Sequence, residues 1–354
     1  MTQNAIAQNF NIQAVFCERS GAPFSAHVLR AMAADIEAGG LFADLCQPWA
    51  DATPQMMFAD ALPLRPLAGL HALALMGTDE GWTRAYQTLH ADALAALLPK
   101  VAKAGQGVLA RYMTSPPQTN EVRRSLCLVG GFLSVAKETG LPLRCLELGA
   151  SAGLNMNWDR FGYAFGGRAT WGDHDSPLQL SGEWSGGAPP LDADVRVVSR
   201  DACDQSPIDV TDPDQALRLR SYIWAEQSDR LERLGAAITI KRATGGVPER
   251  ADAADWAEAH ARPERGVATV VYHSSFMPYP PKHVQARIKA ALEAAGAAAR
   301  AEAPFAWLSK EPDREHPLRH DEVLLRLWRG GEDDGAVRRL AVVHPHGSTV
   351  EWLA

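Results

Sequence analysis

Apolar residues recur every three or four positions in the first part of the chain, which is the spacing of amphipathic helices. The pattern predicts helices over 25–38, 67–76 and 80–98, and each is followed directly by glycine or proline. Alternation of apolar and polar residues, which marks a half-buried strand, does not occur among them. We therefore expect residues 1–114 to form a helical N-terminal cap domain.

Beyond residue 115, short apolar runs alternate with helical segments. Strands are expected at 143–148, 195–199, 237–242, 267–272, 305–308, 323–328 and 340–343. Helices are expected at 121–138, from Asp212 or Asp214 to 234, at 251–260 and at 282–300. The Gly-, Trp- and Pro-rich stretch 161–190 resembles a hairpin-like excursion. This alternation predicts an α/β fold for 115–354, with a mostly parallel sheet and helices on both faces.

The first of these strands leads into a conspicuous turn of small residues. Leu143–Leu148 runs into Gly149-Ala-Ser-Ala-Gly153, and a short helix is expected over 155–160. Small residues let a ligand approach the backbone closely, and unpaired backbone N–H groups at a helix start can bind it. Ligands of parallel sheets bind at the carboxyl ends of the strands. We therefore expect the binding site at this turn.

Known turns of similar composition suggest different chemistries. The dinucleotide fingerprint G-x-G-x-x-G fails at Ser151 and Leu154, and the phosphate loop lacks its lysine. The nucleophile elbow G-x-S-x-G fits literally and would make Ser151 the nucleophile of a serine hydrolase, for example with Asp321 and His344. A hydrolase sheet normally has several strands before its elbow, whereas the preceding residues here are expected to be helical. The hydrolase remains an alternative.

The turn also resembles the first motif of class I S-adenosylmethionine-dependent methyltransferases, in which an acid and one further residue precede Gly-x-x-x-Gly. Glu147, Gly149 and Gly153 fit this pattern, with Ser151 at the usual central glycine. The resemblance implies that an acid after the second strand, Asp204, accepts the ribose hydroxyls. The cofactor-binding residues that it implies are Glu147, Gly149, Ser151, Gly153, Asn155 and Asp204. S-adenosylmethionine is thus the expected cofactor, and methyl transfer to a small molecule or protein is the favoured function.

Several segments after residue 110 are similar to the bacterial family catalogued as domain of unknown function 2332. They are 116–121, 146–155, 203–209, 222–227, 273–279 and 345–352. The resemblance implies a Rossmann-like, methyltransferase-type sheet. The family tends to place a Gly-Asp pair, which would face the adenine, after the strand that ends near Lys241, where 242–246 reads Arg-Ala-Thr-Gly-Gly. This departure favours a third hypothesis, a non-catalytic ligand- or partner-binding protein on a degenerate methyltransferase fold.

Two residues that follow the strand at 267–272 are candidates for catalysis. Histidine is a common general base, so His273 could act as one, or it could fix its loop. Tyr279 could stack on a substrate or donate its hydroxyl, and core packing is an equal alternative. The expected lining of a substrate pocket between cap and core is Gln118, Thr119, Asn120, Glu226 and Gln227. Asn120 is also a good N-cap for the helix over 121–138.

Composition narrows the choice of partners and compartment. The chain has 354 residues, 46% of them apolar, and a net charge of −7. This balance argues against nucleic acid or an anionic membrane as the main partner, because such surfaces require a basic face. The five scattered cysteines include no C-x-x-C pair, so we expect reduced thiols and no metal site. With no apolar run near the ~20 residues of a membrane span, a cytoplasmic protein is expected.

Overall fold

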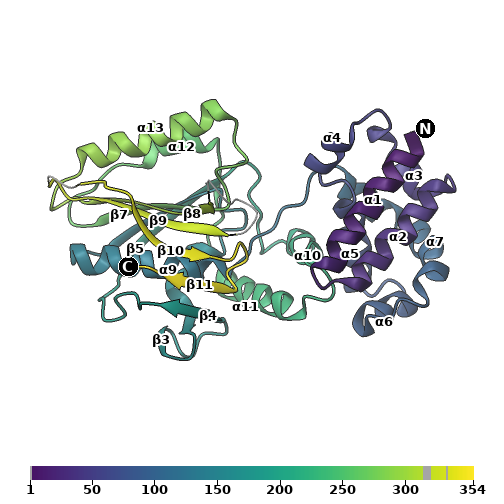
Figure 1. Ribbon diagram of the computed structural model, residues 1–354, viewed down its shortest axis with the longest axis horizontal. Helices are drawn as coiled ribbons and strands as arrows, with labels where there is room; N and C mark the ends of the chain where they lie inside the picture. Colours follow the sequence, from purple (N-terminus) through teal and green to yellow (C-terminus); the bar gives the residue numbers. More distant parts are fainter. Residues whose placement is uncertain (1, 314–319, 332–333) are drawn as a thin grey trace. The chain divides into compact units, whose positions relative to one another are not determined.

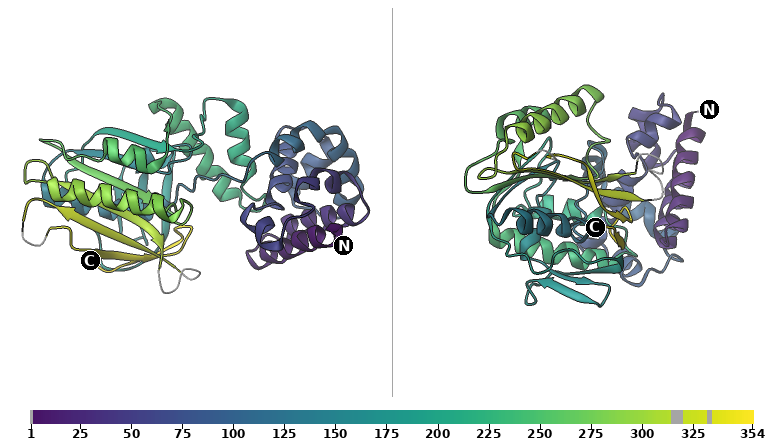
Figure 2. Two further views of the ribbon diagram at one scale, coloured as in Figure 1. Left: turned by 90° about the horizontal axis from the view of Figure 1, so that it is seen from above. Right: turned by 60° about the vertical axis from the view of Figure 1, so that its left-hand side comes forward.

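The computed structural model describes residues 2–313, 320–331 and 334–354, and the chain divides into two compact units. The first unit comprises Met1–Thr119 with Thr211–Glu232, and the second comprises Asn120–Val210 with Arg233–Ala354. The first unit contains α1 to α8 together with α10, and the second contains the sheet (Figure 1 and Figure 2). The order of elements along the sequence predicts that 211–232 belongs to the sheet domain at 115–354, but this segment belongs to the helical unit.

The helices of the first unit pack around a shared apolar core. Those that contribute to it are α1 (Thr2–Arg19), α2 (Pro23–Glu37), α3 (Leu41–Leu45), η1 (Gln47–Trp49), α4 (Pro54–Ala59), α5 (Leu64–Leu75), α6 (Glu80–Thr88), α7 (Leu94–Ala104) and α8 (Gln106–Met113). The remaining helix of this unit, α10 (Pro213–Ser221), packs against α5. The single helix expected over 80–98 is two helices, because Leu89 adopts a left-handed backbone conformation with φ of 54° and ends α6. Pro99 lies inside α7 instead of after it.

The described residues of the second unit form an 11-stranded sheet in the order β3-β2-β4-β11-β10-β9-β8-β7-β1-β5-β6. The strands are β1 (Leu143–Leu148), β2 (Gly162–Phe165), β3 (Ala169–Gly172), β4 (Gln179–Gly186), β5 (Val197–Asp204), β6 (Glu249–Arg250), β7 (Ala268–Ser274), β8 (Phe305–Pro312), β9 (Asp321–Trp328), β10 (Arg338–Val343) and β11 (Thr349–Trp352). Neighbours from β6 through β5, β1 and β7 to β8 are parallel, and those from β8 to β11 are antiparallel. The fold is therefore α/β with a mixed, largely parallel sheet.

Helices cover both faces of this sheet (Figure 1). On one face, α12 (Ala253–His260) and α13 (Lys282–Ala298) share an apolar cluster with Leu146 and Leu148 of β1. On the other face lies α9 (Arg124–Thr139), where a Cβ on Gly131 would overlap the Leu308 side chain of β8. Successive residues of a strand point to opposite faces, so Glu147 lies on the α9 side, where Phe132 of α9 contacts Tyr272 of β7.

The segment expected as a strand at 237–242 lies instead within α11 (Ser228–Thr244). Ile238 and Ile240 alternate with polar residues as they would in a strand, which explains the error. The buried positions at helical spacing are Leu234, Ala237, Ile238 and Lys241. The helix expected from 212 to 234 is correspondingly divided into α10 and α11, and Asp212 is the N-cap of α10 as expected.

The start of α9 also differs from the expectation. The helix begins at Arg124, its N-cap is Arg123, and no side chain caps it. Asn120 instead accepts a hydrogen bond at Oδ1 from the Leu154 N–H, at 3.0 Å. Asn120 therefore fastens the segment that follows the glycine turn and does not cap the helix.

The stretch 161–190 is part of the sheet and not a separate excursion. Its first two strands, β2 and β3, form an antiparallel hairpin, and β4 pairs in parallel with both β2 and β11. The sequence pattern did not predict β11, which joins this region to the remaining strands. Among the described residues, no helix is both long enough and apolar enough to cross a bilayer.

Candidate functional site

The carboxyl ends of β1, β5 and β7 lie side by side because β1 pairs in parallel with both other strands. Glu147 is the penultimate residue of β1, Asp204 is the last residue of β5, and His273 is the penultimate residue of β7. The strand register pairs Glu147 with Tyr272. Predicted site residues from three strands thus share one edge of the sheet.

The small-residue turn after β1 has left-handed backbone geometry at three positions. The φ angle is 68° at Gly149, 55° at Ser151 and 64° at Gly153. Glycine adopts this region freely, whereas for serine it costs about 1–2 kcal/mol. A Cβ on Gly149 would overlap the Phe276 ring, and a Cβ on Gly153 would lie 3.1 Å from Lys241 Nζ. Both glycines are therefore required by backbone angle and by close packing.

The backbone N–H groups of Gly149, Ala150, Ser151 and Gly153 are bonded within the protein and are not unpaired as expected. Those of Gly149 and Ala150 donate to the Cys203 carbonyl at 3.0 and 3.1 Å. The Ser151 N–H donates to Asp204 Oδ2 at 2.8 Å. The turn is therefore connected directly to the half-buried carboxylate that ends β5.

Glu147 is a buried carboxyl beneath this turn. Its Oε2 accepts a hydrogen bond from the Tyr272 hydroxyl at 3.1 Å. Burial raises the pKa of Glu147 to about 8, and the Tyr272 hydrogen bond and the charges of Lys241 and Arg124 oppose this rise. A carboxyl with this pKa is largely protonated at neutral pH, and a cation placed beside it would favour its ionised form.

Asn155 holds the segment after the turn against the start of α9. Its Oδ1 accepts from Ser125 Oγ at 2.7 Å, and its Nδ2 donates to the Glu121 carbonyl at 3.3 Å. Asn155 begins a short 3-10 helix, η2 (Asn155–Arg160), and is itself buried. Its amide is thus engaged in positioning the turn.

The hydroxyl of Ser151 is buried and has no hydrogen-bond partner within the described part of the chain. The residues suggested as its partners in a hydrolase triad are engaged elsewhere. Asp321 forms an ion pair with buried Lys310, and His344 Nδ1 accepts from the His346 N–H at 3.1 Å. The described contacts therefore do not assemble a serine nucleophile with a base.

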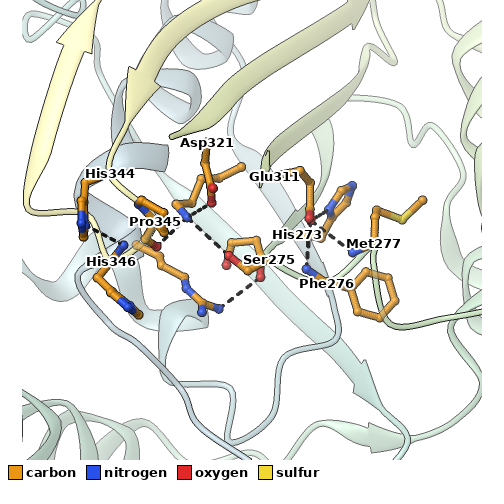
Figure 3. A network of polar contacts seen from close by, with 12 residues as sticks. His273, Ser275, Phe276, Met277, Glu311, Asp321, His344, Pro345 and His346 are labelled. Atoms are coloured by element: carbon orange, nitrogen blue, oxygen red, sulfur yellow. Dashed lines mark hydrogen bonds and ion pairs between the residues drawn. The ribbon is translucent and has the colours of Figure 1, made fainter. Parts of the chain in front are cut away.

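A network of polar contacts fixes the loop after β7 (Figure 3). Buried His273 forms a hydrogen bond of 2.6 Å from Nδ1 to Glu311 Oε1, and its Nε2 accepts from Trp307 Nε1 at 2.9 Å. Both ring nitrogens are engaged, with the Nδ1 proton facing the carboxylate. Glu311 also accepts from the N–H groups of Phe276 and Met277 at 3.0 and 3.4 Å. These contacts support the loop-fixing role of His273.

Lys310, the residue before Glu311 in β8, holds the other side of the same loop. It is fully buried, pairs with Asp321, and donates to Ser275 Oγ at 3.3 Å and to the Pro345 carbonyl at 2.8 Å. Three donors thus meet three acceptors, which satisfies the ammonium group. Sequence reasoning gave Lys310 and Glu311 no role, although a charged pair directly after a buried apolar run could have indicated them.

The loop fixed in this way packs on the glycine turn. The Phe276 ring fills the space that a side chain at Gly149 would need. Tyr279, in the same loop, is 83% exposed, so the core-packing alternative for this residue is wrong. Its ring is accessible to a molecule bound at this edge of the sheet.

The residues expected to line a substrate pocket belong to different units. Asn120 lies in the sheet unit, and Gln118, Thr119, Glu226 and Gln227 lie in the helical unit. Glu226 accepts from the N–H and the Oγ of Ser25 at 2.8 and 2.7 Å, which caps the first turn of α2. Gln227 Oε1 accepts from Arg230 at 3.1 Å. Thr119 lines a cavity of about 60 Å³ within the helical unit.

No group of three or more His, Cys, Asp or Glu side chains that could hold a metal ion occurs in the ranges described. The five cysteines are buried and form no disulfide. Burial raises the pKa of the Cys203 thiol, at the end of β5, to about 12.

Comparison with known proteins yields one family. The sequence model described as an uncharacterised protein conserved in bacteria, domain of unknown function 2332, matches residues 7–352. No curated protein matches the chain, and no solved structure matches it either.

Proposed function

The chain belongs to the bacterial family catalogued as domain of unknown function 2332, and we propose that its sheet unit binds S-adenosylmethionine and transfers the methyl group to an acceptor molecule. One observation carries this proposal. The turn between Gly149 and Gly153 is hydrogen-bonded, through the Ser151 N–H, to the carboxylate of Asp204. The two motifs that suggested a methyltransferase thus meet at one place.

The sheet topology supports a ligand at this place. The parallel strands lie side by side in the order β6, β5, β1, β7 and β8. When these five strands are renumbered by their position along the chain, the order reads 3-2-1-4-5, which is also the order of nucleotide-binding doubly wound sheets. In such sheets the ligand lies where the strand order reverses, at the carboxyl ends of the first and fourth strands. Here these are β1 and β7, which carry Glu147 and His273.

The residues present are compatible with this cofactor. Gly149 and Gly153 carry no side chain in the turn, and the Ser151 hydroxyl is a buried polar group without a protein partner in the part described. Asp204 would accept the ribose hydroxyls, and Glu147 would face the amino group. When bound, S-adenosylmethionine supplies a methyl group on a sulfonium that a nucleophile can attack.

The chain's own contribution would consist mainly of orientation, which can supply much of the rate of a two-molecule reaction. Because both nitrogens of His273 are engaged, we assign this residue the positioning of the loop after β7 in place of proton transfer. Exposed Tyr279 would contact the acceptor.

The sequence feature that favoured a non-catalytic protein is absent from the fold. That hypothesis depended on a Gly-Asp pair missing after a third strand at 237–242, and this segment is helical. The strand that actually follows β5 in space is β6, and Ala251-Asp252 comes directly after it. Asp252 caps α12 by accepting from the Ala254 N–H at 2.9 Å.

Isothermal titration calorimetry with S-adenosylmethionine tests the proposal. We expect saturable one-to-one binding, with a dissociation constant between about 1 µM and 1 mM. Asp204→Asn should weaken binding at least tenfold, whereas Asp201→Asn, exposed in the same strand, should leave it unchanged. No binding at millimolar cofactor, or equal binding by the wild type and the Asp204 variant, would contradict the proposal.

A further inference from the structure

A buried lysine from α11 lies directly against the glycine turn. Lys241 occupies the buried stripe of that helix and is only 4% exposed. Its Nζ lies 3.1 Å from the position that a Cβ on Gly153 would take, beside Met156 Sδ and Pro248. The lysine therefore brings its ammonium group to the backbone of the turn.

The ammonium group of Lys241 lacks an adequate acceptor. Its one described hydrogen bond goes to the Met156 thioether, with 3.6 Å between Nζ and Sδ. A thioether is a weak acceptor, and no ion pair joins Lys241 to a carboxylate in the ranges described. Burial lowers the pKa of Lys241, and the Glu147 carboxyl acts against this shift. By contrast, the buried ammonium of Lys310 has three oxygen acceptors.

The surroundings of the turn are complementary to an amino-acid group. Lys241 is a buried cation without a counter-ion in direct contact, and Glu147 is a buried carboxyl without a direct cation partner among the described residues, although the two are near enough for the charge of each to act on the other. Between them in sequence, the Ser151 hydroxyl is buried and has no described partner. A ligand with both an ammonium and a carboxylate would compensate both groups at once.

We infer that Lys241 binds the carboxylate of an α-amino-acid ligand at the turn, while Glu147 faces its ammonium. This inference rests on the proposed function, because S-adenosylmethionine carries such a group, and it adds the residue that selects the carboxylate. The competing explanation is that Lys241 only fills the space above Gly153. The two explanations differ in which ligand atoms the residue recognises.

Paired calorimetric titrations separate these explanations. One ligand is S-adenosylmethionine, and the other is its decarboxylated analogue, which lacks only the carboxylate. The wild type is expected to bind S-adenosylmethionine about 10- to 100-fold more tightly, the range of a charge-assisted hydrogen bond. Lys241→Met, which keeps the length of the side chain, is expected to bind both ligands with the same weak affinity. Lys137→Met, an exposed lysine in α9 paired with Asp192, is the control for net charge and should retain the wild-type preference.

A second measurement needs no ligand. Because Lys241→Met removes a buried cation that lacks a counter-ion, its unfolding temperature should equal or exceed that of the wild type. Lys241→Leu serves as a second charge-removing variant if the Met variant does not fold. If either variant still prefers S-adenosylmethionine over the analogue by the wild-type ratio, the role of Lys241 is refuted while cofactor binding stands. If the wild type binds neither ligand, the proposed function itself fails.

Discussion

Glu147→Gln is expected to make the chain more stable than the wild type at high pH and equally stable at low pH. Glutamine keeps the size of the side chain and an oxygen that can accept from Tyr272, but it cannot ionise. The wild-type carboxyl is buried beneath the glycine turn, so its ionised form lacks the solvation that it has in the unfolded chain. The variant therefore removes the ionisation of the carboxyl at position 147 and changes little else.

The magnitude follows from the pKa of Glu147, which burial raises from 4.5 to about 8. Between these two values, the folded chain keeps the proton and the unfolded chain has released it. The unfolding free energy of the wild type therefore falls by about 1.4 kcal/mol for each pH unit in this interval. The stabilisation is complete below pH 4.5 and is lost as the pH rises through 8, a total of about 5 kcal/mol.

Urea denaturation followed by tryptophan fluorescence, at about pH 5, 7 and 9, measures this effect as the difference between variant and wild type. The difference should be near zero at the lowest pH and should increase in favour of the variant above neutrality. Glu351→Gln, in an exposed position of β11, is the control and should show no pH-dependent difference. Parallel stability profiles for wild type and Glu147→Gln would refute the reasoning that Glu147 is protonated in the folded chain.

Three further changes test the packing around the site. Gly153→Ala should lower the unfolding free energy by about 2–4 kcal/mol, because φ is 64° and the added Cβ would crowd neighbouring atoms. The control is Gly167→Ala, where φ is 71° and the surrounding space is open, and it should cost only about 1 kcal/mol in the same denaturant titration. Lys310→Met should lower the unfolding free energy by about 3–5 kcal/mol, because it leaves Asp321 buried without a cation. Adding Asp321→Leu should restore most of this stability, and a double variant as unstable as Lys310→Met would contradict the prediction. Glu311→Gln should speed amide hydrogen exchange in the loop after β7 by at least tenfold, since the carboxylate accepts two of its N–H groups; unchanged exchange would exclude that anchoring role.

The sequence predicted the parts of the site that are coded locally. The apolar run at Leu143–Leu148 followed by small residues identified both β1 and the turn, because strand and turn are each set by neighbouring residues. Asp204 was predicted from the acidic residues that follow an apolar run expected to end at residue 199, and the strand β5 in fact extends to Asp204 itself. The turn's backbone partners were not predicted, since they depend on which strand lies beside β1.

Errors arose where two periods coincide or where partners are far apart in sequence. Ile238 and Ile240 are two positions apart, as in a strand. The buried face of α11 instead includes Lys241, and a lysine in the sequence does not indicate a buried helix position. The acceptor of His273 is Glu311, 38 positions further along the chain, and the pair forms only because β7 and β8 are neighbours in the sheet. Contacts of this kind cannot be predicted before the strand order is known.

The most direct measurement of the central claim is a crystal structure of the full chain grown with S-adenosylhomocysteine, the product that methyl transfer would leave. The account predicts density against the turn from Gly149 to Gly153, with the ribose hydroxyls at Asp204 and the carboxylate at Lys241. Crystals without this density at saturating ligand, or with the ligand bound away from the carboxyl ends of β1 and β5, would contradict the claim.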